Sequence, residues 1–525
     1  MQSHHARQSD WWVVRILVAV IVPIIGIYTL LEPFGRDQGI HATIAFALDE
    51  GLVTYRDVYN VKPPLTTVMH WVSQALFGHS MMAIRALDLG AATLAALGLV
   101  EIGRQLHRTP VFGIAAAIGF ATLYYSYGYW EHAQTDGWAG FLLIPAVVLM
   151  LKAWACPNGR SRFLAMLGSG AILGVAFCFK YTIGGAGVLV FTPLAVNFLG
   201  KDEARFYFTD FLACFFGGAV ALFVVMMTLA TYGAWDDFIE IQRYVMSYVG
   251  YKGSDARSPL IGFQLPGMIS VYLLVCVGVG LMLMVFDWIR NRRALVLVVA
   301  VLWIFSGWLS GAAQGKGFAY HFLPLVPAYA ILIGFTVEYI CHRTSGRAFS
   351  NAVAFSLLLG LYFPSQAATE NMSGVRALRA ANGDAVYVGN LVPFSDFDIL
   401  ETLEFAQTLK KHHGPDDTLF VWGFETMLYF LAETPPRYKF PYAWPFMVAH
   451  NDGRYDSDLL NRLKTVPPTH FVVQLQDATP WATGNPRSSE GQLQHFPELL
   501  AFLNENYSQI EEHSRFKLFQ LKRDR

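Results

Sequence analysis

The chain has 525 residues, of which 54% are hydrophobic and 15% aromatic, while only 15% are charged. Ordinary soluble domains carry about 25% charged residues, so this composition excludes such a domain unless the core is very large. The net charge of −1 gives no indication of a nucleic-acid partner.

Eleven apolar segments are candidate membrane-spanning helices, because each approaches the length that crosses a bilayer. Lipid forces such segments to be helical, since no backbone group can stay unpaired there. No small-residue cleavage site follows the first segment, which we therefore interpret as a retained helix rather than a signal peptide. The segments are 11–31, 81–104, 111–127, 136–154, 163–179, 183–199, 208–231, 263–287, 295–311, 321–341 and 349–363.

The orientation follows from the distribution of Lys and Arg. If the N-terminus is cytoplasmic, the inner connections carry more of these residues than the outer connections before residue 364, although the inner ones are shorter. An odd number of spans then places the C-terminal part outside.

The first outer stretch, residues 32–80, is expected to form two amphipathic helices that lie in the membrane interface. Lys62-Pro63-Pro64 separates them, and Pro suits the start of a helix. The apolar residues at helical spacing in the first helix are Ile40, Ile44, Ala47, Leu48 and Leu52. The polar residues at helical spacing in the second are Thr66, Thr67, His70, Ser73 and Gln74.

The C-terminal part, residues 364–525, has a different composition and is long enough for its own α/β core. We therefore divide the chain into a transmembrane domain, 1–363, and a C-terminal extracytoplasmic α/β domain, 364–525. The expected strands are Thr418–Val421, His470–Leu475 and Phe516–Leu521, and the expected helices include Leu400–Lys411 and Pro497–Asn506.

The cysteines limit covalent and metal chemistry. None follows residue 341, so the C-terminal part contains no internal disulfide, and no pair has the CxxC spacing of a metal site. They are Cys156, Cys178, Cys214, Cys276 and Cys341.

Asp37 follows the first apolar segment directly. A carboxylate in this place could accept a proton from an acceptor hydroxyl. The structural alternative is the N-cap of a helix that starts at Gln38, a position that suits Asp. The two interpretations are compatible.

A second polar cluster stands between the third and fourth apolar segments and contains Glu131, His132 and Asp136. A second acid such as Asp136 could hold a divalent cation or position a base. The structural alternative is again a helix cap, for the fourth segment.

Several cations are expected at the outer ends of the spans. A single one is most simply explained by snorkelling to lipid headgroups or by pairing with a surface acid. The group as a whole favours an anion-binding site, for which phosphate is the obvious ligand. The residues are Lys62, Lys180, Lys316, Arg85 and Arg243, with His321 nearby.

The order of these features carries a family resemblance. After the acid of the first loop come Tyr55…Lys62-Pro63-Pro64, Leu76-Phe77-Gly78…Arg85, Thr135-Asp136, Phe179-Lys180, Gly317-Phe318-Ala319-Tyr320-His321-Phe322-Leu323-Pro324-Leu325, Val421-Trp422-Gly423-Phe424-Glu425…Leu428-Tyr429-Phe430-Leu431-Ala432 and Pro435-Pro436-Arg437-Tyr438. Over nearly its whole length the chain resembles the bacterial membrane glycosyltransferases of the GT-C type. These are relatives of protein O-mannosyltransferases and of the lipid A aminoarabinose transferase.

The resemblance implies an inverting glycosyltransferase of the bacterial inner membrane, with the C-terminal domain in the periplasm. It would move a sugar from a polyprenyl-phosphate donor to a lipid, glycan or protein acceptor of the cell envelope. Asp37 matches the catalytic base, and Lys62 and Lys180 match positions that contact the lipid phosphate. Tyr55 and Tyr320 belong to the same motifs and are further expected substrate-binding residues.

The resemblance also implies that Asp136 is a second acid near the site, which helps to hold a divalent metal in some relatives. Two departures weaken the metal assignment. Many relatives have two adjacent acids in the first loop, whereas Asp37 stands between Arg36 and Gln38. The aminoarabinose transferases have Glu before Lys-Pro-Pro, where this chain has Asn60-Val61. No cofactor is therefore assigned, and the metal stays an open alternative.

Two other functions remain in view. An oligosaccharyltransferase of the same fold class would carry a Trp-Trp-Asp signature, which Ala234-Trp235-Asp236-Asp237 does not match. A flippase or transporter of lipid-linked sugars would show paired repeats with charges near the middle of the bilayer, whereas no repeat is visible and the charges cluster toward one face.

Overall fold

The computed structural model describes residues 8–157, 159–200, 205–250, 271–343, 346–380 and 382–522. Contacts within the chain group its residues into two compact units. The helical unit comprises residues 1–32, 84–225 and 258–383, and the mixed unit comprises 33–83, 226–257 and 384–525. Each unit is therefore assembled from three separate stretches of sequence.

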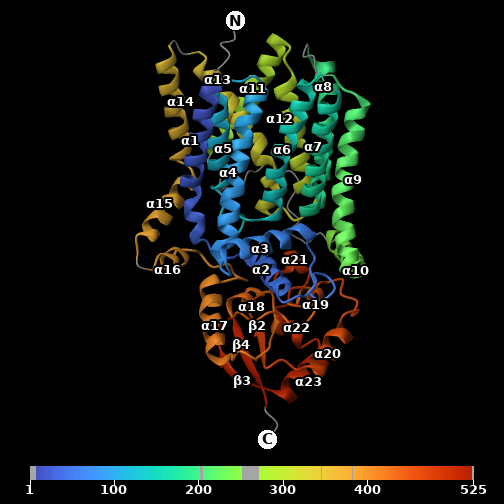
Figure 1. Ribbon diagram of the computed structural model, residues 1–525. Helices are drawn as coiled ribbons and strands as arrows, with labels where there is room; N and C mark the ends of the chain where they lie inside the picture. The colour runs from blue at the N-terminus through green and yellow to red at the C-terminus, as the bar shows by residue number, and fades with distance from the viewer. Residues whose placement is uncertain are drawn as a thin grey trace. The chain divides into compact units, whose positions relative to one another are not determined.

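The helical unit consists of helices that run side by side (Figure 1). Its elements are α1 (Gln8–Gly26), η1 (Ile27–Leu31), α4 (Met81–Gln105), α5 (Pro110–Tyr124), α6 (Thr135–Ala155), α7 (Gly159–Phe179), η2 (Tyr181–Phe191), α8 (Thr192–Leu199), α9 (Phe208–Thr231), α11 (Val271–Asn291), α12 (Leu295–Ala313), η4 (Ala319–Leu325), α13 (Val326–Cys341), α14 (Arg347–Tyr362) and α15 (Gln366–Leu378). The short helix α16 (Gly383–Val388) begins at the last residue of this unit and otherwise belongs to the mixed unit.

Nine helices among the described residues are long and apolar enough to cross a membrane. A tenth span is formed if α14 and α15, which meet at a bend of 75°, count as one, and α5 is a shorter apolar helix. Every expected span thus contains a helix, although two of the eleven do not reach spanning length alone. The first residues of the span expected at 263–287 lie outside the described residues. The chain is a multi-pass membrane protein.

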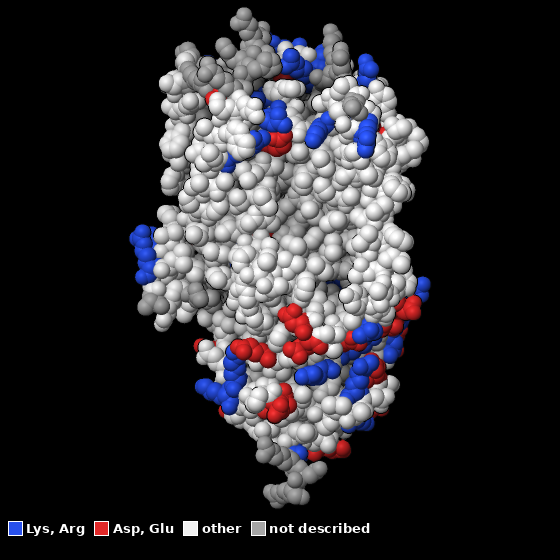
Figure 2. Space-filling view, viewed as in Figure 1, with Lys and Arg blue, Asp and Glu red and all other residues white. Residues whose placement is uncertain are grey.

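The outward faces of these helices suit lipid. Large apolar side chains stay exposed, among them Ile16 on α1 and Phe215 on α9, which keep 62% and 66% of their surface. On the face that Figure 2 shows, the middle part of the helical unit carries almost no charged side chains. In water such a surface would be an aggregation hazard, but in a bilayer it is the expected boundary.

Small residues allow α7 and α9 to approach closely. A Cβ atom on Gly170 would lie 1.8 Å from the carbonyl oxygen of Cys214, and one on Gly217 would lie 2.0 Å from that of Leu167. Such contacts are typical of helices that associate in membranes, where burial of apolar surface gives no driving force.

The mixed unit contains a four-stranded sheet of order β1-β2-β4-β3. β1 (Leu419–Trp422) pairs parallel to β2 (His470–Gln474), while β4 (Phe516–Leu521) is antiparallel to both β2 and β3 (Tyr507–Glu512). The helices of this unit are α2 (Arg36–Asp49), α3 (Pro64–Phe77), α10 (Trp235–Gly250), α17 (Ile399–His412), α18 (Met427–Leu431), α19 (Trp444–Met447), α20 (Asp456–Thr465), α21 (Pro480–Thr483), α22 (Ser489–Leu493) and α23 (Pro497–Asn506).

Alternation along the strands builds a core on each face of the sheet. Leu419, Val421 and Val472 pack with α17 on one face. On the other, Phe420 and Trp422 join a larger cluster that also takes in apolar residues from distant parts of the chain, namely Ile40, Ile44, Ala47, Tyr55, Val58, Tyr59, Ile241 and Tyr244. The first outer stretch and α10 are thus held by the same core as the C-terminal sheet.

The two helices expected in the first outer stretch are present as α2 and α3. α2 is not amphipathic, because residues 38–45 are buried on all sides of it, whereas α3 has two contrasting faces. In α3 the buried side chains are the polar ones, Thr66, Thr67, His70, Ser73 and Gln74. The apolar residues Val68, Trp71, Leu76 and Phe77 stay exposed. This inside-out pattern is what a helix needs when its inner face meets protein and its outer face meets the membrane interface.

The expected elements of the C-terminal part are also confirmed, and β3 is an additional strand. The α/β character of this part therefore holds. The expected domain division at residue 363 stays a prediction, because the compact units are drawn from interleaved stretches rather than from one cut.

Candidate active site

The predicted base lies in the first turn of α2. The amide of Gly39 donates to the carbonyl of Gly35 at 3.0 Å, which makes Gly35 the N-cap. The alternative role of Asp37 as N-cap of a helix starting at Gln38 is therefore wrong, since the helix begins at Arg36. A carboxylate in the first turn still benefits from the helix dipole.

Lys62 pairs with Asp37. Its Nζ lies 3.1 Å from Oδ2 of Asp37, and the two side chains keep 21% and 19% of their exposure. A partly exposed pair of this kind contributes at most about 1 kcal/mol, so it does not lock either group. Because an ammonium has three donors, Lys62 can hold Asp37 and an anion together.

Tyr55 fixes the segment that carries Lys62. Its ring is fully buried, and its hydroxyl donates to the carbonyl of Lys62 at 2.8 Å. Its φ of 73° lies in the left-handed region, which is strained for an aromatic residue and persists only where the surroundings enforce it. Tyr55 therefore acts as a positioning residue for Lys62.

His41 lies one helical turn after Asp37 and is buried. Burial and the positive charge of Lys62 lower the pKa of His41 to about 3, against the opposing effect of Asp37. Its ring is therefore neutral at physiological pH. Nδ1 has no hydrogen-bond partner among the described residues, which makes His41 a polar group available beside the Asp37–Lys62 pair.

Arg36 clamps the start of α2 to the C-terminal part of the mixed unit. Its guanidinium contacts Oε1 of Glu425 at 2.8 and 2.9 Å, Oδ2 of Asp396 at 2.8 Å and the carbonyl of Asp396 at 2.8 Å. The rings of Phe397 and Phe424 both lie 5.5 Å from it. The pKa of Arg36 is raised, because Glu425 and Asp396 outweigh the effect of burial. The clamp fixes the position of the neighbouring Asp37.

Arg243 lies on the exposed side of α10 and lines a cavity of about 420 Å³. The cavity carries two arginines and two acids, so it is not a purely cationic site. Its lining residues are Trp235, Asp236, Ile239, Glu240, Arg243 and Arg454.

In the helical unit, Asp136 and Lys180 form a second pair of an acid and a lysine. Nζ of Lys180 lies 3.1 Å from Oδ2 of Asp136, Gln314 donates to Oδ1 at 2.9 Å, and the Thr135 hydroxyl donates to Oδ2 at 3.3 Å. Asp136 is fully buried, while Lys180 keeps 14% of its side-chain exposure. The N-cap of α6 is Gln134, so the capping role considered for Asp136 is wrong.

Lys316 follows Gln314 in the connection between α12 and η4. It stands between Gly315 and Gly317, whose φ angles of 66° and 67° form the tight turn. Burial lowers the pKa of Lys316. Tyr320 and His321, both buried, follow in η4 with their ring centroids 4.6 Å apart.

Arg85 and His132 belong to an enclosed polar network of the helical unit. Nδ1 of His132 lies 2.9 Å from Oε1 of Glu32, and Arg85 lies 3.4 Å from the same carboxylate. Arg85 also donates to the carbonyls of His132 and Tyr129. Because Arg85 and His132 are fully buried, this arrangement favours a positioning role over contact with substrate.

Glu131 precedes this network. Burial raises the pKa of Glu131 to about 7, although the charge of His132 opposes the shift. The carboxylate accepts from the amide of Gly128 at 3.2 Å.

The arrangement does not fit the divalent metal considered for Asp136, Glu131 and His132. Asp136 is occupied by Lys180 and Gln314, and His132 by Glu32. Among the described residues, the one group that brings three ligand atoms together consists of other side chains. No catalytic step is therefore assigned to a metal here.

Comparison with known proteins agrees with this architecture. Residues 61–230, which include Lys62, Asp136 and Lys180, match the family described as dolichyl-phosphate-mannose-protein mannosyltransferase. A comparison with curated protein sequences gives no match. The structure is similar to that of ArnT from Cupriavidus metallidurans in the apo state, with a TM-score of 0.59 and 16% identity over 98% of both chains. The chain has the GT-C fold.

Two further structures share the GT-C fold. ArnT from the same organism bound to undecaprenyl phosphate gives a TM-score of 0.55 with 15% identity, again over 98% of both chains. The oligosaccharyltransferase of Archaeoglobus fulgidus in the apo form gives 0.52 with 12% identity, over 91% of this chain and 72% of that chain. The resemblance inferred from the order of the motifs is thus confirmed.

Sequence reasoning missed His41, Gln314 and the partners of Arg36. His41 could have been found from its spacing of one turn after Asp37. Gln314 lies two residues before Lys316, and nothing local in the sequence indicated its contact with Asp136. The partners of Arg36 carried no local signal, because Glu425 lies 389 positions away.

Proposed function

We propose that this chain is an inverting glycosyltransferase that moves a sugar from a polyprenyl-phosphate donor to a lipid, glycan or protein acceptor. The observation that carries the proposal is the Asp37–Lys62 pair in a chain with the GT-C fold. It joins a base to a phosphate-binding cation. The neighbour whose structure holds undecaprenyl phosphate supports the class of donor.

Asp37 is the general base in this proposal. The acceptor hydroxyl attacks the anomeric carbon of the donor, and Asp37 takes the hydroxyl proton as the new C–O bond forms. The bond between the anomeric carbon and the phosphate oxygen breaks, and the polyprenyl phosphate leaves with the electron pair. Burial lowers the pKa of His41 to about 3, so its neutral ring is a weak base that presents a polar group beside Asp37.

Lys62 and Lys180 stabilise the phosphate in this proposal. Groups aimed at developing charge often supply a few kcal/mol each to the transition state. Because the donor phosphate is already charged in the ground state, part of this is simple binding. Burial lowers the pKa of Lys316, and a bound anion would favour its ammonium form. Arg243, Tyr320 and His321 are kept as further substrate-binding residues.

The site is proposed to face the periplasm from the bacterial inner membrane. The excess of Lys and Arg in the inner connections supports this orientation. A reporter fused after residue 525 should be active in the periplasm, and a cytoplasmic signal from that fusion would refute the orientation.

The test is transfer by the detergent-purified full-length chain, comparing Asp37→Asn with the wild type on a panel of radiolabelled polyprenyl-phosphate sugars. The expected result is a loss of about 10²- to 10⁴-fold in kcat, with undecaprenyl phosphate still bound. The matched control is Asp49→Asn, which makes the same change on the exposed last residue of the same helix and should leave kcat unchanged.

Three outcomes separate the possibilities. Transfer unaffected by Asp37→Asn keeps the class of enzyme and moves the base elsewhere, first to Asp136. Loss of transfer in the Asp49→Asn control would show that the assay reports helix stability. Absence of transfer with every donor, together with scrambling of lipid-linked sugars in liposomes, would refute the transferase and favour the flippase.

A further inference from the structure

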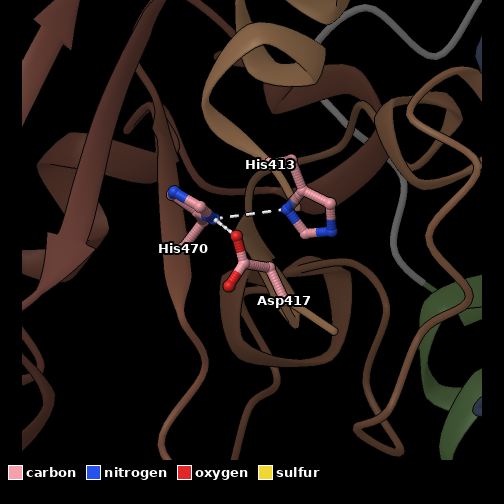
Figure 3. Close-up of side chains that lie close together, drawn as sticks. All are labelled: His413, Asp417 and His470. Atoms are coloured by element: carbon pink, nitrogen blue, oxygen red, sulfur yellow. Dashed lines mark hydrogen bonds and ion pairs between the residues drawn. The ribbon is translucent and has the colours of Figure 1, made fainter. Parts of the chain in front are cut away.

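Three side chains of the mixed unit converge where strands β1 and β2 begin, and the proposed glycosyl transfer uses none of them (Figure 3). His413 follows the end of α17, Asp417 stands in the turn before β1, and His470 is the first residue of β2. Each offers one ligand atom, and the three atoms lie within 4.8 Å of one another.

The distances suit a small transition-metal ion. Nδ1 of His413 lies 3.2 Å from Nδ1 of His470, and Oδ2 of Asp417 lies 3.9 Å from the latter. Two donors that each bind zinc at about 2 Å in tetrahedral geometry stand roughly 3.3 Å apart. The two nitrogens already have this spacing. The carboxylate of Asp417, which keeps 29% exposure, needs only a small rotation.

The surrounding hydrogen bonds orient the ligands. The Thr434 hydroxyl lies 3.2 Å from the carbonyl of Ala432, to which it donates its hydrogen. Its oxygen also lies 2.8 Å from Nε2 of His413, so Nδ1 of the same ring is left toward His470. The amide of Gly414 donates to Oδ2 of Asp417 at 2.7 Å. Metal-binding histidines and carboxylates are typically held by such outer contacts.

We propose that His413, Asp417 and His470 bind a zinc-class divalent ion, with a water in the fourth position. The ion would join the end of α17 to the first residues of β1 and β2, so that a single ligand ties three segments of the C-terminal sheet together. An ion that binds only the folded state stabilises that state.

The test uses the full-length protein in detergent, stripped with a chelator and then titrated with Zn²⁺ or with Co²⁺. We expect about one equivalent of zinc by elemental analysis and the visible absorption of four-coordinate cobalt. His413→Gln and Asp417→Asn should weaken binding by at least about 10-fold. They should also abolish the rise in melting temperature that zinc gives the wild type. His413 and Asp417 are only half-buried, so these variants avoid the fully buried His470.

The matched control is His412→Gln, which removes the adjacent histidine that faces Glu511 rather than the cluster. It should bind zinc as the wild type does. Equal binding by the wild type and His413→Gln would overturn the proposal and leave a hydrogen bond between the two rings as the reason for their approach. Loss of zinc in Asp136→Asn, with full binding by His413→Gln, would instead place the metal in the helical unit.

Discussion

Replacing Arg36 by Met should destabilise the mixed unit strongly, because it removes the charge that balances a buried carboxylate. Glu425 keeps only 1% of its side-chain exposure and Asp396 keeps 12%. Removing one partner of a buried pair costs about 3–5 kcal/mol. Gln474, whose amide donates to Glu425 at 3.3 Å, still offers partial compensation. We therefore expect Arg36→Met to lower the free energy of unfolding by an amount near the lower end of this range, about 3 kcal/mol.

Neutralising Glu425 in the same protein should restore part of this stability. In Arg36→Met with Glu425→Gln the fully buried charge is gone, Asp396 is the one carboxylate of the clamp that stays unbalanced, and the amide can still bond to Gln474. The coupling between the two substitutions should therefore be favourable by about 2 kcal/mol, within the range of directly contacting groups.

The loss should also depend on pH. Burial already raises the pKa of Glu425 above its ordinary value of 4.5, and Arg36 opposes this rise. Without Arg36 the folded-state pKa rises further. A carboxyl whose pKa is higher in the folded state stabilises the fold when protonated and loses this contribution as pH rises through the folded-state pKa. The deficit of Arg36→Met should thus be smallest below pH 4.5 and grow as pH rises above it.

Hydrogen exchange, measured by mass spectrometry on the detergent-purified chain, reports the local loss of stability in Arg36→Met. Arg36→Met should lower protection in α2 and in residues 419–425, and kcat should fall about 100-fold if Asp37 shifts by about 1 Å. Unchanged protection in both segments would refute the clamp. A similar loss of protection in the single and double variants would show that buried charge is not the cause.

Two further substitutions test single contacts in the mixed unit. Tyr55→Phe removes the hydrogen bond to the carbonyl of Lys62, which is worth about 1 kcal/mol. The KM for the donor should therefore rise about fivefold, while kcat changes less. The control is Tyr232→Phe, the same change at an exposed position. Burial raises the pKa of Asp477 from 3.8 to about 6, although Ser489 donates to both carboxylate oxygens. The protonated carboxyl therefore stabilises the fold below pH 3.8. This contribution to the free energy of unfolding, on the order of 3 kcal/mol, is lost as pH rises to about 6. Asp477→Asn should flatten the melting temperature over this interval, and an unchanged pH profile would contradict it.

The sequence predicted those parts of the fold that rest on local patterns. The length of the apolar segments predicted the spans, and short apolar runs in the C-terminal part predicted β1, β2 and β4. The strand β3 was missed because it is an edge strand in which only Tyr507 is buried, so its sequence carries little alternation. The helix α10 was not among the predicted elements, because its amphipathic stretch is too polar to be a span.

The candidate site was predicted in its residues but not in its contacts. Asp37, Lys62, Asp136 and Lys180 were identified as single charges, yet nothing local indicated that each acid would be paired with one of the lysines. The burial of charged side chains could not be predicted either, since the sequence does not distinguish the fully buried Arg85 from a cation at the surface.

The interleaved construction of the mixed unit has a consequence for how the protein is made. Arg36 and Asp396 are 360 positions apart, which at a synthesis rate of about 5–20 residues per second corresponds to a delay of roughly 20–70 s. During that interval α2 and α3 are already synthesised while their C-terminal partners are not. The exposed apolar side chains of α3 can meanwhile contact the membrane interface. The C-terminal stretch then docks onto the first loop, and Arg36 can hold Asp37 in place only after residues 396–425 have been made.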